Sequence, residues 1–460
     1  MTAEVKLPEG WKNCQLIDLG SVVTGKTPST KITENFGGEF PFIKPGDLDN
    51  GGFIKNTADT LTVLGLSSVP ELPPNSIAVT CIGNLGKVGI TTQRSATNQQ
   101  INSVIPSEHL SYKFLYHQIC TLKPWLEAEA SATTVAIINK GKFSKAPIKL
   151  PPLAEQKVIA DKLDTLLAQV ESSKVRLERI PQILKRFRQS VLAAAVNGEL
   201  TEEWRGKHQL DLKTWKLLKV GDVVEKIEAG KNLKCIEVPP VGDQKGIIKI
   251  SAVTWGIFDE EESKTLPLVS DFIEERRIKV GDFLISRANT LELLGNPVIV
   301  HKVTKNLMLS DKVLRLVMHE ADKPWLCIFL RSTTGRIEIE SRSTGNQLSM
   351  RNIGQKALLD IDIPKPTVEE QTEIVRRVEQ LFAYADTVEQ QVQNALARVN
   401  NLTQSILAKA FRGELTAQWR KDNPDLICGD NSAEALLEKI KAEREAIKPE
   451  KKTQARKMTA

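Results

Sequence analysis

Residues 155–205 read EQKVIADKLDTLLAQVESSKVRLERIPQILKRFRQSVLAAAVNGELTEEWR, and residues 370–420 repeat this stretch at a shift of 215 residues without a gap. Sixteen of the 51 aligned positions are identical, among them the opening Glu-Gln and the closing Trp-Arg of each copy. Chance would produce only a few matches. The two stretches are therefore copies of one unit, and the chain is an internal duplication.

Both copies carry an apolar stripe in steps of four and three residues, the spacing that keeps one seam of a helix facing a partner helix. The second copy has the stripe Ile374, Val378, Leu381, Ala385, Val388, Val392, Ala395, Val399, Leu402 and Ile406. The first has Ile159, Leu163, Leu166, Val170, Ser173, Leu177, Ile180, Leu184, Phe187 and Val191, with Ser173 as the polar exception. A helix of about 45 residues reaches roughly 65–70 Å. That length predicts a strut rather than a helix buried inside one domain.

Proline and glycine residues mark the ends of both predicted helices. Pro151-Pro152 and Pro364-x-Pro366 precede them, and Gly198 and Gly413 follow them, the usual asymmetry of helix ends. Pro181 predicts a kink in the first helix. Because each seam is buried best against the other, we expect an antiparallel pair that holds two heads apart as a pseudo-two-fold dumbbell.

The segments that precede the two helices resemble each other weakly. Trp11-Lys12 is echoed by Trp215-Lys216, and Phe42-Ile43-Lys44 by Ile247-Ile248-Lys249. Short β-branched runs separated by Gly, Asn and Pro predict strands and tight turns in both. We therefore predict an α+β protein with two similar mixed heads and a coiled-coil pair: residues 1–150 (first head), 151–205 (first helix), 206–363 (second head), 364–420 (second helix) and 421–460 (C-terminal basic tail).

The charge balance is mildly basic and evenly spread. The chain has 460 residues, 63 Lys+Arg and 57 Asp+Glu, and its net charge of +6 divides as +2, +1, +2 and +1 over 1–150, 151–205, 206–363 and 364–460. Any DNA contact must therefore come from lysines and arginines that the fold gathers on one face. The last residues predict a solvated tail, or alternatively a loose contact to DNA or a partner, through Lys448, Lys451, Lys452, Arg456 and Lys457.

Several kinds of chemistry are disfavoured. Gly20–Thr27 fits the Walker A string, but Pro28 follows at once and no convincing helix start comes after it, so we expect a simple turn. The six cysteines form no close pair, and five histidines without H-E-x-x-H argue against a metal site. The Asn/Asp-Pro-Pro-aromatic motif of amino-methylating enzymes is missing too. We predict a non-catalytic chain, and one that is cytoplasmic, because neither a signal peptide nor an apolar membrane span is present.

The combined pattern resembles the specificity subunits of type I restriction–modification systems, and is most similar to the IA subfamily. The likeness covers the whole chain and is strongest over the repeats. In the heads it rests on Trp11, Leu16, Asp18-Leu19-Gly20, Gly25-Lys26-Thr27-Pro28-Ser29, Phe40-Pro41-Phe42-Ile43-Lys44 and Gly46-Asp47-Leu48. In the helices it rests on residues 148–156, 180–189, 363–371 and 395–407.

This resemblance implies a division of labour. Each head would read one half of a bipartite site in double-stranded DNA, and the helices would set the gap and dock two modification subunits. Two restriction subunits would complete the complex. S-adenosylmethionine, ATP and magnesium would belong to those partners, with no cofactor or metal in this chain and no membrane contact.

Residues that read base edges are expected on loops, as Lys, Arg, Asn and Gln. The candidates are Lys44, Asn84, Lys87, Gln99, Gln100 and Asn102 in the first head, and Lys249, Arg287, Asn289, Lys312, Arg315, Asn346 and Gln347 in the second. For each of them the alternative is an ordinary solvated loop residue. For the chain as a whole, two alternatives to DNA reading stay open: a structural adaptor with two protein-binding heads, and a P-loop nucleotide-binding enzyme.

Overall fold

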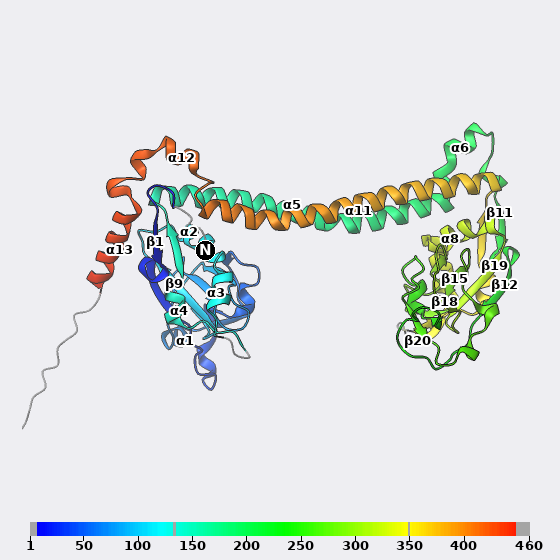
Figure 1. Ribbon diagram of the computed structural model, residues 1–460, viewed down its shortest axis with the longest axis horizontal. Helices are drawn as coiled ribbons and strands as arrows, with labels where there is room; N and C mark the ends of the chain where they lie inside the picture. The colour runs from blue at the N-terminus through cyan, green and yellow to red at the C-terminus, as the bar shows by residue number, and fades with distance from the viewer. Residues whose placement is uncertain (1–6, 132–134, 348–349, 448–460) are drawn as a thin grey trace, which may run out of the picture. The chain divides into compact units, whose positions relative to one another are not determined.

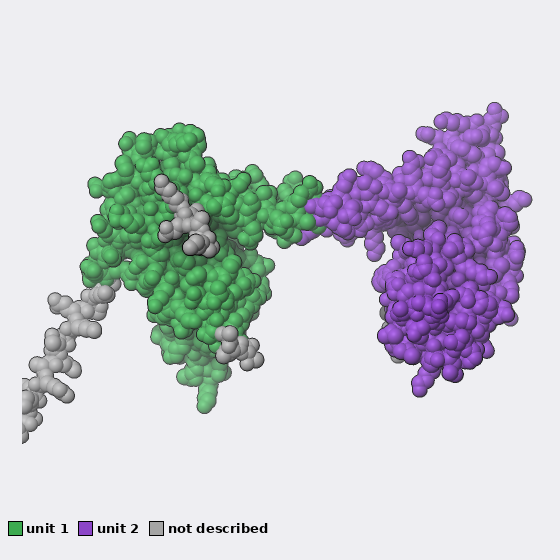
Figure 2. All heavy atoms as spheres, in the orientation of Figure 1, with its two compact units in different colours: residues 1–176, 395–460 green, residues 177–394 purple. Residues whose placement is uncertain are grey.

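The computed structural model describes residues 7–131, 135–347 and 350–447. The chain forms two compact units: unit 1 comprises residues 1–176 and 395–460, and unit 2 comprises residues 177–394 (Figure 2). Both divisions fall inside the two long helices. Each unit therefore holds one head together with one part of each helix.

The two long helices are α5 (Leu153–Val196) and α11 (Val368–Phe411), each of 44 residues (Figure 1). Each begins just after the predicted prolines. Each ends two residues before a glycine with positive φ, +80° at Gly198 and +74° at Gly413, a conformation that glycine adopts without steric cost. Helix α5 continues through Pro181, and the kink expected there stays a prediction.

The apolar seams pack the two helices antiparallel. In unit 1, Ile159 and Leu163 of α5 share a core with Ile406 and Ala410 of α11, so the start of one helix meets the end of the other. In unit 2 the end of α5 packs on the start of α11, through Val191, Leu192, Ile374 and Val378. The predicted seam is wrong at Leu402, which is 45% exposed.

The head of unit 1 contains two main sheets and a short strand pair. The antiparallel pair is β1 (Lys12–Gln15) with β10 (Pro147–Leu150). The five-stranded sheet has the order β2 (Gly20–Thr24), β9 (Ile101–Pro106), β6 (Ile77–Thr80), β7 (Val88–Thr91) and β4 (Phe53–Ile54). The three-stranded sheet has the order β5 (Asp59–Leu61), β3 (Phe36–Ile43) and β8 (Ala96–Thr97). The helices are α1 (Val63–Ser67), α2 (Tyr112–Cys120), α3 (Lys123–Glu129) and α4 (Lys140–Ser144).

The head of unit 2 repeats the strand pair, four strands of the main sheet and the three-stranded sheet, and adds a further three-stranded sheet. Its strand pair is β11 (Lys216–Lys219) with β22 (Asp362–Lys365), and its four-stranded sheet has the order β12 (Val224–Ala229), β19 (Val313–Met318), β15 (Phe283–Ser286) and β17 (Pro297–Ile299). Two three-stranded sheets follow the orders β14 (Ser263–Thr265), β13 (Lys245–Ile248), β18 (Asn306–Met308), and β16 (Ala288–Asn289), β21 (Met350–Asn352), β20 (Thr344–Gln347). The helices of unit 2 outside the long pair are α6 (Glu202–Lys207), α7 (Val220–Val223), α8 (Lys323–Arg331), α9 (Thr333–Ser341) and α10 (Gln355–Leu359).

Two fully buried strands, β6 and β15, explain why the two weakly similar sequences share one fold. Strand β6 reads IAVT and strand β15 reads FLIS, and all four residues of each are buried. Such short apolar runs are typical of strands covered on both faces. The duplicated heads predicted from the sequence are confirmed by this matching order of strands.

A buried carboxylate joins the head of unit 1 to both long helices. Glu155, at the start of α5, is fully buried and accepts hydrogen bonds from the Trp11 indole Nε1 (2.8 Å), the Thr416 hydroxyl (2.5 Å) and the Arg420 guanidinium (2.5 Å). Arg420 also donates to the Gly413 carbonyl (2.6 Å), beyond the end of α11. We call these four side chains clamp 1. A buried charge is tolerated when it is paired and hydrogen-bonded in this way.

The same arrangement recurs in unit 2 as clamp 2. Glu370, at the start of α11, accepts from the Trp215 indole (2.7 Å), the Thr201 hydroxyl (2.7 Å) and the Arg205 guanidinium (2.5 Å). Arg205 reaches the Gly198 carbonyl (2.5 Å). Each clamp thus ties the first strand of its head to the start of one long helix and to the segment after the other.

The C-terminal segment departs from the prediction. The sequence predicts residues 421–460 to be a C-terminal basic tail without regular structure of its own. The segment instead continues from α12 (Ala417–Asp422) to α13 (Ala433–Ile447), which lies against the head of unit 1 beside β1 (Figure 1). Ala433, Leu436 and Ile440 are buried in the core of that head, and Arg444 donates to the Ile17 carbonyl. The basic residues from Lys448 onward lie outside the described residues.

Candidate functional site

Two segments of the first head, far apart in sequence, meet beside the central strand β9. The turn that follows β2 contacts the loop that precedes β9: the amide of Gly25 donates to the Ile101 carbonyl (3.0 Å), and the amide of Lys26 donates to the Thr97 carbonyl (2.9 Å). A Cβ atom on Gly25 would lie 2.1 Å from the Asn98 carbonyl oxygen, so the close approach requires glycine.

The second head is built in the same way. The amide of Gly230 donates to the Ser310 carbonyl (3.2 Å), and a Cβ atom on Gly230 would lie 1.8 Å from the Leu309 carbonyl oxygen. The residue just before the central strand is held alike in both heads. The Gln100 carbonyl accepts from the Cys81 amide and the Lys312 carbonyl from the Arg287 amide, both at 2.8 Å. Gln100 and Lys312 are therefore equivalent positions.

A lysine after a neighbouring strand faces an acidic partner in each head. Lys44 follows β3 and pairs with Asp59, while Lys249 follows β13 and lies 3.9 Å from Glu262. Each lysine also opens a short 3-10 turn, Pro45–Leu48 in the first head and Ile250–Val253 in the second. The Gly-Lys turn, this lysine and the loop before the central strand are the three segments that we call the reading edge.

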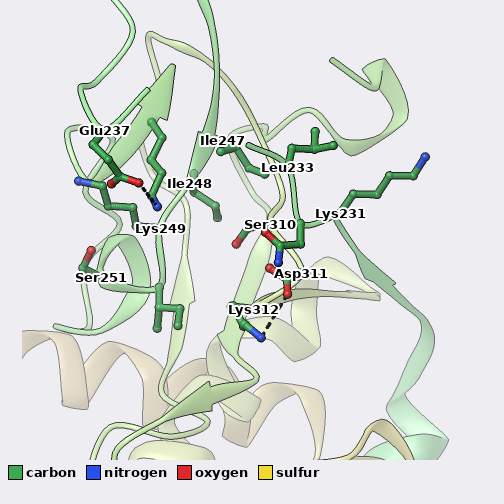
Figure 3. A pocket seen from close by; sticks show the side chains of 13 residues that line it. Lys231, Leu233, Glu237, Ile247, Ile248, Lys249, Ser251, Ser310, Asp311 and Lys312 are labelled. Atoms are coloured by element: carbon green, nitrogen blue, oxygen red, sulfur yellow. Dashed lines mark hydrogen bonds and ion pairs between the residues drawn. The ribbon is translucent and has the colours of Figure 1, made fainter. Parts of the chain in front are cut away.

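In the second head the reading edge surrounds a cavity of about 520 Å³ (Figure 3). Its lining carries both signs of charge, from Lys231, Lys249, Lys264, Lys312, Glu237 and Asp311. Lys264 is paired with Glu237 (2.6 Å), and Lys312 with Asp311 (3.2 Å). Such a surface offers both donors and acceptors, which is what base edges require and more than a purely phosphate-binding patch would need.

The structure brings part of the predicted set to the reading edge. In the first head Lys44 and Gln99 are exposed and Gln100 is half-buried, and in the second Lys312 is exposed and Lys249 half-buried. Gln99 is fixed by a hydrogen bond from the Thr27 hydroxyl to its amide oxygen (2.7 Å).

The remaining accessible candidates lie on neighbouring loops. Exposed Asn84 and half-buried Lys87 follow β6, where Lys87 pairs with Asp49. Exposed Arg287 follows β15 directly. Asn289 is half-buried, and its amide donates to the Thr254 hydroxyl (3.3 Å). These four stay predictions as DNA contacts.

Strand β20 ends with the backbone of the last two candidates, Asn346 and Gln347, whose side chains lie outside the described part of the structure. Their assignment as DNA contacts therefore also stays a prediction.

Asn102 is wrongly assigned as a base-reading residue. It is 3% exposed on β9, and its amide is engaged at both ends, accepting from the Thr24 hydroxyl (2.7 Å) and donating to the Ile138 carbonyl (3.2 Å). As folded, it has no free edge to offer a base.

Arg315 is wrongly assigned for the same reason. It is 8% exposed, and its guanidinium lies between Glu228 (3.1 Å) and Asp282 (3.2 Å) while donating to the Arg277 carbonyl (2.7 Å). Burial raises the pKa of the Asp282 carboxyl, against the opposing pull of Arg315. Arg315 therefore compensates two half-buried acidic groups of the head.

Three side chains of the reading edge were absent from the predicted set: Lys26, Lys231 and Asp311. The signal for the first two was visible, because a Gly-Lys dipeptide follows the first strand of the main sheet in both heads. Gly20–Thr27, for which a simple turn was expected rather than a Walker A loop, is a strand followed by a turn. Residues 20–24 are strand β2 itself, and the next helical segment is a three-residue 3-10 turn at Thr33–Asn35, so no helix N-terminus faces a phosphate loop.

Within residues 7–131, 135–347 and 350–447, no cluster of His, Cys, Asp and Glu side chains is arranged to hold a metal ion. In the same ranges, no helix has the length and apolarity to cross a bilayer.

The duplicated heads and the antiparallel helices define a class of α+β proteins with two similar recognition domains joined by a pair of long helices. The family model for the type I restriction modification DNA specificity domain matches residues 8–182 and 212–398, and the chain belongs to this family. It is 39% identical over 458 residues to the EcoKI specificity subunit of Escherichia coli K12, covering 96% of this chain and 97% of that protein. It is 36% identical over 459 residues to the EcoBI specificity subunit of Escherichia coli, covering 96% and 94%.

Solved structures share the fold at low sequence identity. The HsdS subunit of Thermoanaerobacter tengcongensis aligns with a TM-score of 0.57 at 18% identity, over 89% of this chain and 98% of that one. A chain from a structural study of type I restriction–modification complex assembly and conformational transition aligns with a TM-score of 0.63 at 17% identity, over 89% and 99%. The resemblance to IA-type specificity subunits is confirmed.

Proposed function

We propose that this chain selects the DNA sequence on which a type I restriction–modification complex acts, reading one half of a split site with each head. The observation that carries the proposal is the repetition of the reading edge. Both heads gather a Gly-Lys turn, a lysine and a loop before the central strand at one place, although the residues of that loop differ. One scaffold with two sets of side chains suits a site whose halves differ in sequence.

The helix pair has a separate task in this proposal. Its exposed faces dock two modification subunits, and its fixed length sets the gap between the half-sites. Restriction subunits, also two in number, join the same complex. S-adenosylmethionine, ATP and magnesium are bound and used by those partners, while this chain contributes DNA recognition and no catalysis.

Mapping methylated adenines tests the proposal. We expect cells that express this chain with its modification partner to methylate adenines within one split sequence, read by single-molecule sequencing of genomic DNA. Cells with the modification partner alone are the control. Methylation that is random, or absent while both proteins are expressed and associated, would contradict the proposal.

A salt titration separates DNA reading from the adaptor alternative. Binding that neutralises phosphates weakens steeply as salt rises. We therefore expect the assembled complex to shift a DNA probe that carries the mapped sequence in 50 mM salt, and to lose most of its affinity by 200 mM. An adaptor with two protein-binding heads would shift no DNA at either concentration.

A further inference from the structure

The two reading edges present different chemistry at one equivalent position. The residues immediately before the central strand are Gln99-Gln100 in the first head and Asp311-Lys312 in the second. Their backbones are held by matching hydrogen bonds, from Cys81 and Arg287. The position is therefore the same, while two neutral amides in one head replace an acid–base pair in the other.

In the first head the two amides are oriented before any ligand arrives. Thr27 donates to the amide oxygen of Gln99 (2.7 Å), and the Asn98 side chain donates to that of Gln100 (2.9 Å). Each glutamine keeps its NH₂ group for a further acceptor, and its oxygen retains a second lone pair. A glutamine amide that donates and accepts side by side matches the major-groove edge of adenine.

In the second head Asp311 and Lys312 lie side by side at the rim of the cavity (Figure 3), with the Lys312 ammonium 3.2 Å from the Asp311 carboxylate. Both are accessible, at 29% and 48% of their side-chain surface. Ser310 also lines the cavity and is 8% exposed, and its buried hydroxyl has no hydrogen-bond partner among the described residues.

We propose that Asp311-Lys312 reads a C·G base pair in the half-site of the second head, and that Gln99-Gln100 reads an A·T pair at the equivalent place in the other half. This inference rests on the proposed function. The major-groove edge of a C·G pair offers the O6 and N7 acceptors of guanine and the N4 amino donor of cytosine. Lys312 donates to the guanine acceptors, and Asp311 accepts from the cytosine amino group. A neighbouring acid–base pair thus matches both bases of one pair.

The test exchanges the residue pair before the central strand between the two heads. Asp311→Gln with Lys312→Gln gives the second head the residues of the first at an unchanged net charge. We expect the methylated sequence to change at one position of one half-site, from C·G toward A·T, with the other half and the gap retained. The preference for C·G should fall by roughly tenfold to hundredfold, the range for one lost bidentate contact. The reciprocal change, Gln99→Asp with Gln100→Lys, should alter only the other half-site.

Glu203→Gln with Lys207→Gln on α6 is the matched control, because it removes one acid and one base from exposed positions that are not part of the reading edge. It should leave the sequence unchanged. A complex of Asp311→Gln/Lys312→Gln that methylates the original sequence at the original efficiency overturns the inference. If that variant methylates too little for mapping, the purified complex is used to select sites from a randomised DNA library. Loss of selectivity at one position supports the inference, and loss across both halves overturns it.

The unsubstituted complex separates this inference from the proposed function. If it methylates no split sequence, the proposed function itself fails. If it methylates one and the exchanges leave that sequence intact, the proposed function stands and the assignment of these residues fails.

Discussion

The joint between head and helices is built on an ion pair in unit 1 and on a cavity of mixed apolar and charged lining, Arg331 and Glu379 included, in unit 2. In unit 1, Asp164 on α5 accepts from Lys113 (2.7 Å) and contacts the buried His117 imidazole (2.8 Å), both on α2. In unit 2 the matching helix α8 presents Pro324 and Ile328 at a cavity of about 330 Å³, whose lining includes α11.

The clamps, by contrast, are the same in both units, down to the residue types of all four members. Clamp and joint together show that duplication has kept the attachment of the strands to the helix ends, while the packing beside it has diverged. Unit 1 also carries α13, which packs on its head. Four substitutions separate what the units share from what distinguishes them.

The largest effect is expected from the shared feature. Glu155→Ala should leave the Arg420 guanidinium and the Trp11 indole without the carboxylate that pairs with them, and Glu370→Ala should do the same to Arg205 and Trp215. Removing one partner of a buried ion pair costs about 3–5 kcal/mol. Hydrogen exchange followed by mass spectrometry on the full chain should show lost protection in unit 1 for the first variant and in unit 2 for the second.

Glu369→Ala, at an exposed position beside Glu370, is the control and should change protection little. If both clamp variants behaved like this control, the clamps would be incidental contacts rather than the attachment of the heads.

A smaller effect is expected from the feature that unit 1 alone possesses. Ile440 of α13 is fully buried in the core of the first head. Ile440→Ala should destabilise unit 1 by about 2 kcal/mol, the low end for such truncations because the helix lies near the end of the chain. Faster hydrogen exchange in β1 and α13, with unit 2 unchanged and exposed Glu438→Ala as the control, would confirm this asymmetry. Equal exchange in both variants would mean that α13 does not support the head.

The sequence predicted the long helices well because their signals are local. A period of 3.5 residues, prolines before each helix and glycines after it identify the strut without knowledge of the fold. The repeat also displayed Glu155 with Glu370, and Arg205 with Arg420, as identities. Their contact could not be read from it, because Glu155 and Arg420 are 265 residues apart in the chain.

The reading edge was only partly predictable, because residue type does not reveal which way a strand residue faces. Gln99 and Lys312 precede their strands and are accessible, whereas Asn102 and Arg315 lie three residues further on, inside those strands, and are buried in the head. The C-terminal helix was missed for a different reason. The charge-rich segment was interpreted by composition, although the spacing of Ala433, Leu436 and Ile440 is that of a buried helical face.

The smallest effect is expected from the polar joint, through pH. Burial lowers the pKa of His117, while hydrogen bonds from Lys113 and His117 hold the pKa of Asp164 below its usual range despite its partial burial. A neutral imidazole that donates from Nε2 to an ionised Asp164 is consistent with both lowered pKa values. Because the unfolded chain binds a proton at His117 near pH 6.5 while the folded chain binds it only at lower pH, the unfolded state gains protons first on acidification. The free energy of unfolding of unit 1 should therefore decrease as pH falls below about 6.5.

His117→Ile, which installs the type of residue found at Ile328, should remove that contribution. We expect hydrogen exchange in α2 to accelerate between pH 7.5 and 5.5 in the unsubstituted chain, after correction for intrinsic exchange rates, and to accelerate less in His117→Ile. Identical pH profiles for the two proteins would show that His117 titrates alike in the folded and unfolded chain, and the polar joint would then contribute no pH dependence of its own.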